Sequence, residues 1–276
     1  MLTSMNELLQ IAEKRNCAIP AFNVYNAETA LGMIFAAEEA NACVILQMYS
    51  RLFSNYEAKF LLPSILQAIR DSKVKMAFHL DHGASDEAVA RALRWGCTSV
   101  MRDASTLPLE ENIQVLKNVV HYAHELGVDV EGELGHIGVA AEGVGTEYTK
   151  VDEAVRFVDE TGVDALAIMV GTAHGHYKQA PVIAIDRIAE IHAATKAHLV
   201  LHGGSGVPDD QIQAAIKAGI RKINFGTDVC CALLDAFHDV DPKIVAVDMF
   251  MKEPTQAVKR FALEKIALLG AEGTND

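Results

Sequence analysis

Three histidines, each followed directly by glycine, are the residues of this sequence best suited to bind a catalytic metal ion. They are His82, His174 and His202. One histidine alone is more often a core or loop residue, but three imidazoles can bind zinc and leave its fourth tetrahedral position open for water or substrate. Glu133 is a candidate further ligand or partner of a ligand, and Asp103 a residue that orients a ligand. These residues predict an open metal centre.

A glycine-rich segment with the sequence HGGSG occupies residues 202–206 and leads into a helix expected to begin near Pro208. Backbone amides in such a turn, backed by the N-terminus of a helix, form a binding site for an anion. A second segment, INFGTD at residues 223–228, places Thr227 where it can join this site. A glycine-rich turn alone is weak evidence, but its place in the fold strengthens the prediction of one bound phosphate.

Eight apolar or β-branched runs, each followed by a turn and a segment of helix length, give the chain a repeating strand–helix pattern. They cover residues 18–23, 43–48, 75–81, 99–103, 129–134, 165–170, 198–202 and 222–226. Their near-continuous apolar character is typical of parallel strands buried on both faces. No GxGxxG follows the first run, which disfavours a doubly wound dinucleotide-binding sheet. The pattern predicts an α/β protein, a (β/α)8 TIM barrel that forms a single domain over residues 1–276.

Polar residues lie at or just beyond the carboxyl ends of nearly all eight runs. In a TIM barrel these ends converge on the catalytic face, and the loops after strands seven and eight usually bind phosphate. The loop at 135–150 is long enough to act as a lid. Lys178 is a further candidate for offsetting substrate charge. The residues at or near the run ends are Asn23, Asp81, His82, Asp103, Glu133, His174, His202 and Asn224.

Composition restricts the possible partners. The chain has 24 Lys and Arg against 37 Asp and Glu, and its net charge of −13 disfavours binding to nucleic acid or anionic membranes. No apolar stretch approaches the roughly 18 residues of a membrane span. Residues 1–16 predict an amphipathic helix rather than a signal peptide, so we expect a cytoplasmic protein. The 5 cysteines include no CxxC pair, which argues against a disulfide framework.

Six strings resemble, in order and spacing, the class II (zinc-dependent) fructose- and tagatose-bisphosphate aldolases. Each string alone could arise by chance, whereas six in one order form a specific signature. The resemblance extends from about residue 22 to residue 228. The strings are HLDHG (79–83), MRDAS (101–105), VEGELGHIG (130–138), GTAHGHYK (171–178), VLHGGSGVP (200–208) and KINFGTD (222–228).

The resemblance implies a reversible retro-aldol cleavage of a ketose 1-phosphate derivative, such as fructose or tagatose 1,6-bisphosphate or a 6-sulfo analogue, to dihydroxyacetone phosphate and an aldehyde. It implies that Asp81 moves the proton of the aldehyde-derived oxygen. It also implies that the carbonyls of Gly175 and Gly203 bind a monovalent cation, Na⁺ or K⁺. The implied zinc ligands are His82, His174 and His202, with Glu133 an alternative, and the implied ligands of dihydroxyacetone phosphate are Gly203, Ser205, Asn224 and Thr227.

Several positions depart from the family pattern. Ala140 and Ala141 stand where an acidic residue is usual, which leaves Glu142 as the nearest candidate for the base that deprotonates the triose. Tyr49 or Ser50 replaces a serine that contacts phosphate in many relatives.

The remaining departures concern basic residues. Arg51 follows the second strand, and Arg102 replaces an apolar residue before the aspartate of the fourth strand. The basic segment that reaches in from a neighbouring subunit has its nearest match in Asp241-Pro242-Lys243. We therefore predict that the aldehyde carries an anion bound by Arg51, Arg102 or a basic residue of a neighbouring subunit, since arginine suits multi-oxygen anions.

Three other functions agree less well with the sequence. A non-catalytic barrel subunit of an aldolase complex is expected to lack metal ligands or Asp81, and this chain retains them. A metal-dependent barrel hydrolase usually has HxH after strand one, where this chain has Phe22-Asn23-Val24. A Schiff-base aldolase needs a strand lysine, and Lys222 is expected at a strand start, away from the active face. We expect a homodimer or homotetramer that acts on a small sugar phosphate.

Overall fold

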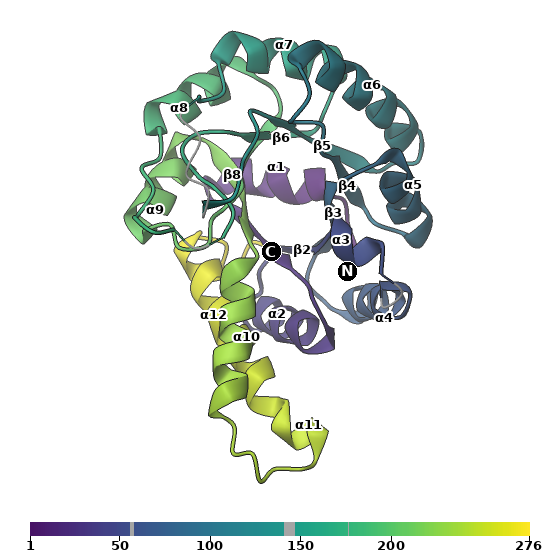
Figure 1. Cartoon of the computed structure of the whole chain (residues 1–276), viewed down its shortest axis with the longest axis vertical. Helices are drawn as coiled ribbons and strands as arrows, with labels where there is room; N and C mark the ends of the chain where they lie inside the picture. The colour runs from purple at the N-terminus through teal and green to yellow at the C-terminus, as the bar shows by residue number, and fades with distance from the viewer. Residues whose placement is uncertain (56–57, 141–146, 176) are drawn as a thin grey trace.

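The computed structural model describes residues 1–55, 58–140, 147–175 and 177–276, and its centre is a closed parallel barrel (Figure 1). The barrel closes where Ala21 pairs with Asn224. Each of the eight predicted runs overlaps one strand, so the predicted (β/α)8 TIM barrel is confirmed. The strands are β1 (Ile19–Asn23), β2 (Val44–Tyr49), β3 (Met76–Gly83), β4 (Ser99–Arg102), β5 (Asp129–Leu134), β6 (Ala165–Ile168), β7 (His198–Leu201) and β8 (Ile220–Phe225).

Helices surround the barrel, and two of them are followed by a turn at glycine. Gly127, just after α6, and Gly162, after α7, have φ values of 69° and 73°, in the left-handed region that glycine enters without strain. The helices are α1 (Met5–Arg15), α2 (Ala27–Glu39), α3 (Ser50–Phe53), α4 (Ala58–Asp71), α5 (Asp86–Trp95), α6 (Leu109–Glu125), α7 (Val151–Thr161), α8 (Ile185–Ala194), α9 (Asp209–Ala218), α10 (Thr227–Asp239), α11 (Val247–Phe250) and α12 (Lys252–Leu268).

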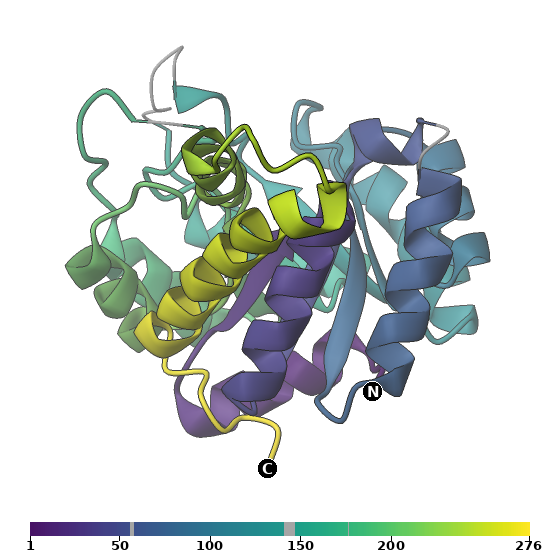
Figure 2. The ribbon, with the colours of Figure 1, turned by 90° about the horizontal axis from the view of Figure 1, so that it is seen from below.

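Helix α1 closes the amino-terminal end of the barrel (Figure 2). Its apolar residues Met5, Leu8, Leu9 and Ala12 follow the spacing of one helix face and are fully buried. They pack against side chains from inside the barrel, among them Ile45. The predicted amphipathic helix is therefore present, and it covers the amino-terminal end of the barrel.

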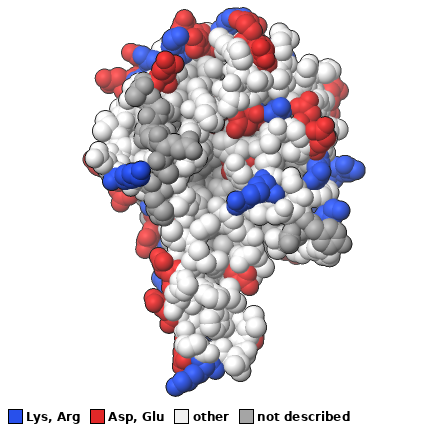
Figure 3. Space-filling view, viewed as in Figure 1, with Lys and Arg blue, Asp and Glu red and all other residues white. Residues whose placement is uncertain are grey.

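Helices α10 and α11 form an arm, residues 227–251, that projects from the barrel (Figure 1). The arm starts at the barrel mouth, because α10 follows β8 directly. Figure 3 shows that much of the visible face of the arm carries no charged side chains, and Val245 is 91% exposed. Other exposed apolar residues on the arm are Leu234, Phe237, Ile244, Val247 and Met249. No helix in the described ranges is long and apolar enough to cross a membrane.

Candidate active site

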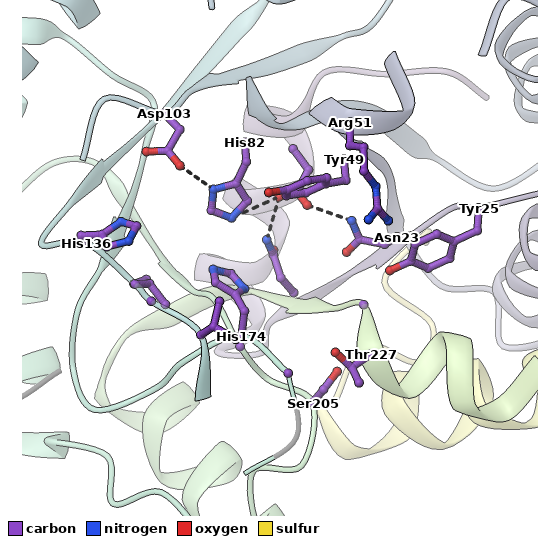
Figure 4. A pocket seen from close by; sticks show the side chains of 18 residues that line it. Asn23, Tyr25, Tyr49, Arg51, His82, Asp103, His136, His174, Ser205 and Thr227 are labelled. Carbon is purple, nitrogen blue, oxygen red and sulfur yellow. Dashed lines mark hydrogen bonds and ion pairs between the residues drawn. The ribbon is translucent and has the colours of Figure 1, made fainter. Parts of the chain in front are cut away.

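The three predicted metal-binding histidines meet at the barrel mouth. His82 ends β3, His174 follows β6 and His202 follows β7 directly. One ligand nitrogen from each lies within 4.8 Å of the others. The structure therefore brings together three imidazoles from three strands, as the sequence predicted, and Figure 4 shows His82 and His174 close to one another.

A local irregularity of β3 aims His82 into the mouth. The register between β3 and β4 shifts between Leu80 and Gly83, and His82 has a φ of 49°, which is uncommon for a residue with a side chain. Gly83 allows β4 to approach, since a Cβ at this position would lie 2.3 Å from the Met101 carbonyl oxygen. A residue with a side chain would clash here, which explains why glycine follows His82.

Four buried polar atoms in the centre point to a cation. His82 Nε2, His174 Nε2, His202 Nδ1 and Glu133 Oε2 have no hydrogen-bond partner within the described residues. Glu133 Oε2 lies 3.2 Å from His202 Nδ1, close enough for charge attraction but without hydrogen-bond geometry. Buried polar atoms are costly unless they are paired. A divalent metal bound by the three histidines would satisfy their unpaired nitrogens, so these residues fit the predicted metal, with Glu133 as a fourth ligand or a close neighbour.

The opposite nitrogens of two histidines are held by carboxylates. His82 Nδ1 lies 2.8 Å from Asp103 Oδ2, and His202 Nε2 lies 2.9 Å from Glu131 Oε1. Asp103 also accepts hydrogen bonds from the backbone and hydroxyl of Ser105. This geometry supports the predicted orienting role of Asp103, because such carboxylates fix the tautomer and direction of a ligand. Glu131 was not predicted, although its alternation with Glu133 in an apolar strand was a signal that both face inward.

The histidines His174 and His202 differ in how strongly they hold a proton. Burial lowers the pKa of His174 to about 4, helped by the neighbouring His202 and His82, so its imidazole is neutral and free to bind a metal. Burial also disfavours the imidazolium of His202, but the carboxylates of Glu131 and Glu133 raise its pKa to about 10. A proton and a metal therefore compete for the same nitrogen of His202.

Asp81 lies beside the histidines, and its charged carboxylate is fixed by hydrogen bonds. Asn23 Nδ2 donates to Asp81 Oδ2 at 2.8 Å, and Asn224 Nδ2 donates to Oδ1 at 3.3 Å. Burial acts to raise its pKa, but the neighbouring His82, His202 and other donors lower it overall. At neutral pH it can accept a proton. Gln47, which sequence reasoning missed, donates to Asn23 Oδ1 at 2.9 Å and fixes the direction of that amide.

A cavity of about 440 Å³ opens above these groups. Gly226 and Thr227 sit at the N-terminus of α10, and the Ser205 hydroxyl accepts a hydrogen bond from the backbone of Asp228, so this wall presents a helix terminus to an anion. Figure 4 shows Ser205 and Thr227 side by side. The predicted residues that line the cavity are Asn23, Arg51, Asp81, His82, Asp103, His174, Gly175, Gly203, Ser205, Asn224 and Thr227.

The lining also contains two residues that sequence reasoning missed, Tyr25 and His136, and a third, Tyr49, that it named only as a replacement for a serine. Tyr25, Tyr49 and His136 line the cavity. Arg51, on α3, is the single Lys or Arg among the described lining residues. Burial raises the pKa of Tyr49 despite the nearby Arg51, so its hydroxyl stays neutral. Tyr25 and His136 lie in loops just beyond β1 and β5. The sequence indicated their place in the site only through their closeness to the ends of these two strands.

Two predicted basic residues are not brought to the cavity. Arg102 Nε donates to Asp86 Oδ1 at 3.0 Å, and its Nη1 donates to the carbonyls of Gly83 and Asp103, which directs the guanidinium toward α5. Lys178 is exposed and is not part of the lining. The prediction that these two side chains contact the substrate therefore finds no support in their positions.

The expected position of Lys222 was wrong in one respect, since it does not begin its strand, although it stays outside the cavity lining as expected. We expected it at a strand start, away from the active face, but it lies inside β8, fully buried, with Nζ 2.8 Å from Glu131 Oε2. Since Glu131 also binds His202, Lys222 is one residue removed from the metal centre. It does not line the cavity, so it cannot form a Schiff base with a substrate bound there.

Other predictions remain untested. Ala140 is buried, but Ala141 and the predicted base Glu142 lie outside the described residues. The Gly203 carbonyl accepts a hydrogen bond from the Tyr177 hydroxyl at 2.8 Å. The monovalent cation expected at the Gly175 and Gly203 carbonyls stays a prediction.

Comparison with known proteins gives a consistent result. The sequence profile described as "Fructose-bisphosphate aldolase class-II" matches residues 3–274. A protein of Escherichia coli K12, "Uncharacterized protein YdjI", is 39% identical over 267 residues, 95% of each chain. The "6-phospho-5-dehydro-2-deoxy-D-gluconate aldolase" of Shouchella clausii is 41% identical over 237 residues, 84% of this chain and 81% of the relative. A "Fructose-bisphosphate aldolase" of Staphylococcus aureus is 37% identical over 280 residues, covering 98% of this chain and 97% of the relative.

Solved structures agree with these sequences. The crystal structure of "the YdjI aldolase from Escherichia coli K12" superposes with a TM-score of 0.92 at 36% identity and covers 100% of both chains. A "putative fructose-1,6-biphosphate aldolase" of Coccidioides immitis superposes with a TM-score of 0.90 at 26% identity, covering 98% of this chain and 97% of the other.

Proposed function

As a member of the class II fructose-bisphosphate aldolase family, this chain is an aldolase, and we propose that it is zinc-dependent and cleaves a ketose 1-phosphate with a second anionic group. The products are dihydroxyacetone phosphate and an aldehyde. The observation that carries this proposal is one cavity that combines unpaired histidine nitrogens, a held carboxylate and an anion-binding helix terminus. Fructose and tagatose 1,6-bisphosphates and their 6-sulfo analogues are the substrates to test first.

His82, His174 and His202 would hold the metal, with Glu133 beside them. When bound, a divalent zinc ion polarises the ketone carbonyl of the substrate and offsets the negative charge that develops there. The protein contributes the position of the three imidazoles. Asp103 and Glu131 orient two of these imidazoles, because each binds the second ring nitrogen of one histidine.

Asp81 is the group that we propose takes the proton from the hydroxyl that becomes the aldehyde oxygen. Its carboxylate is charged at neutral pH, lines the cavity and is held by two amides, from Asn23 and Asn224. A positioned carboxylate of this kind typically contributes about 10²–10⁴-fold to the rate. In the synthetic direction the same group returns the proton.

The phosphate of the dihydroxyacetone half would lie against Gly203, Ser205 and the start of α10 at Gly226 and Thr227. These residues line one wall of the cavity. Unpaired backbone N–H groups at the start of a helix, together with hydroxyl groups, favour a phosphate dianion. A bulk charge of −13 would otherwise repel such a substrate, so this local site is required.

Arg51 is the residue that we propose recognises the anion of the aldehyde half. It lines the cavity together with Tyr25 and Tyr49, and no other Lys or Arg occurs among the described lining residues. A guanidinium donates two parallel hydrogen bonds to a phosphate, sulfonate or carboxylate. The names of the relatives include a fructose bisphosphate aldolase and an aldolase of a phosphorylated dehydro-deoxygluconate, so family membership alone does not determine the aldehyde.

We also propose that the chain forms a homodimer or homotetramer, with the apolar arm in the interface. Val245 and Val247 are 91% and 74% exposed in the single chain, and Phe237 and Met249 extend the same apolar surface. Monomeric proteins seldom leave such a surface uncovered, and closed symmetric oligomers are the usual arrangement. The expected cytoplasmic location is a separate prediction.

A non-catalytic subunit of an aldolase complex is less consistent with this site. Such a subunit has no need to keep Asp81 charged and held beside three histidines with unpaired nitrogens. A substrate panel tests the proposal: the enzyme supplied with zinc should release dihydroxyacetone phosphate from a ketose 1-phosphate that bears an anion at carbon 6. Absence of dihydroxyacetone phosphate from every ketose 1-phosphate in the panel would contradict it.

A further inference from the structure

A buried chain of charged groups lies directly below the histidines, inside the barrel. Lys222 Nζ donates to Glu131 Oε2 at 2.8 Å, and Glu131 Oε1 lies 2.9 Å from His202 Nε2. All three side chains are fully buried. Lys222 lies in β8, Glu131 lies in β5 and His202 directly follows β7, so the barrel itself sets their spacing.

The charged groups Lys222 and Glu131 do not contact the substrate, and a contribution to folding stability is a poor explanation for their presence. Neither Glu131 nor Lys222 lines the cavity. Removing two charges from water is expensive, and apolar residues of similar size often stabilise a protein as well as a buried ion pair does. A role in orienting His202 gives the pair a purpose that apolar residues cannot supply.

We propose that Glu131 is a positioning residue that keeps the proton of His202 on Nε2, so that Nδ1 faces the metal unprotonated. This inference rests on the proposed metal centre. Only one oxygen of Glu131 binds His202, and Lys222 occupies the other. Lys222 thereby fixes which oxygen faces the histidine and balances the negative charge of Glu131 inside the barrel.

The arrangement predicts an unusual effect of Glu131→Gln, a change that preserves size. The amide oxygen of the new side chain must face Lys222, because an ammonium group donates and cannot accept. Its NH₂ group would then face His202 Nε2 and require an acceptor there. The His202 proton would move to Nδ1, the nitrogen that the metal needs, so an isosteric change should weaken metal binding.

The chain offers a matched control on the same strand. Arg221, next to Lys222, is also buried, and its Nε donates to Glu13 Oε2 at 2.8 Å. Glu13 belongs to α1 at the opposite end of the barrel. Replacing Arg221 and Glu13 by methionine therefore removes a partly buried ion pair of the same kind without touching a histidine of the metal centre.

The experiment measures Co²⁺ affinity of the metal-free full-length protein by competition with a coloured chelator, together with the visible spectrum of bound Co²⁺. The variants are Glu131→Gln, Lys222→Met, the double change Glu131→Met with Lys222→Met, and the Arg221 and Glu13 control. The double variant leaves no unpaired buried lysine, so it keeps the test available if Glu131→Gln does not fold.

We expect the two variants that lack the Glu131 carboxylate to bind Co²⁺ about 10–100-fold more weakly than the wild type. Lys222→Met keeps that carboxylate and should bind Co²⁺ as tightly as the wild type. The Arg221 and Glu13 control should also keep the wild-type affinity. Equal affinity of the wild type and the Glu131 variants, or an equal loss in the control, would overturn the inference. A wild type that binds neither Co²⁺ nor Zn²⁺ would overturn the proposed metal centre as well.

Discussion

Replacing Asp81 by asparagine removes a proton acceptor while the surrounding structure can adapt. Asn23 cannot turn its amide, because its oxygen accepts from Gln47, so the new side chain must keep its oxygen toward Asn23. Its NH₂ group then faces Asn224, whose own Oδ1 has no partner within the described residues. A flip of the Asn224 amide would present that oxygen and restore the hydrogen bond. We therefore expect a folded variant that retains metal.

The size of the kinetic effect follows from the role of Asp81. Loss of a positioned general base costs about 10²–10⁴-fold in rate, which corresponds to about 2.7–5.4 kcal/mol of transition-state free energy. The proposed role concerns only the oxygen of the aldehyde half. Exchange of the proton on the reacting carbon of dihydroxyacetone phosphate, a step of the donor half, should therefore continue in Asp81→Asn at nearly the wild-type rate.

The assay follows cleavage kcat, this exchange in deuterated water and metal content in the same preparations. A fall in cleavage with exchange and metal content preserved would support the assignment. Equal losses in cleavage and exchange would show that Asp81 acts on the metal site or the donor half. Cleavage near the wild-type rate would show that another group moves the proton.

Three further predictions concern other parts of the molecule. Arg51→Met should lower kcat/KM about 10–200-fold for substrates with an anion at carbon 6 and much less for a neutral analogue, whereas Arg102→Met should lower neither; equal losses for both substrates would exclude Arg51 as the anion contact. Burial opposes the charge of Glu13, but Arg221 and His192 lower its pKa below the ordinary 4.5. The stabilising effect of the Glu13 carboxylate should therefore be complete above pH 4.5 and disappear as the pH falls through the lowered pKa. Urea unfolding should accordingly show Glu13→Gln less stable by about 1.5–3 kcal/mol near pH 7, with a difference that narrows in acid; a constant difference would contradict this. Val245→Glu on the arm should shift the protein to a smaller species in light scattering, and an unchanged mass would place the interface elsewhere.

Much of the site was predictable because strand ends are visible in the sequence. His82, Asp81 and Asn224 interrupt apolar runs where a buried strand should end, and a parallel barrel brings all such ends to one face. That reasoning needs only the order of elements. It located part of the cavity wall, including Asn23, Asp81 and His174, without knowledge of any distance between them.

The remaining residues depended on directions that periodicity does not give. Arg51 and Arg102 both lie near strand ends, yet one enters the cavity and the other turns to Asp86 on α5. Neighbouring positions of a strand face opposite sides, so an uncertainty of one residue in the strand end reverses the prediction. Glu131 and Lys222 meet across the barrel from β5 and β8, and only the closed structure shows that their side chains share one layer.

Metal removal tests the central claim most directly. The purified enzyme is treated with a chelator until metal analysis shows no divalent ion, and cleavage of a ketose 1,6-bisphosphate is measured before treatment, after treatment and after addition of Zn²⁺. We expect activity to disappear with the metal and to return with zinc, because the nitrogens of His82, His174 and His202 are then occupied again. His174→Ala should not recover. Full activity in a sample demonstrably free of metal would contradict a zinc-dependent mechanism.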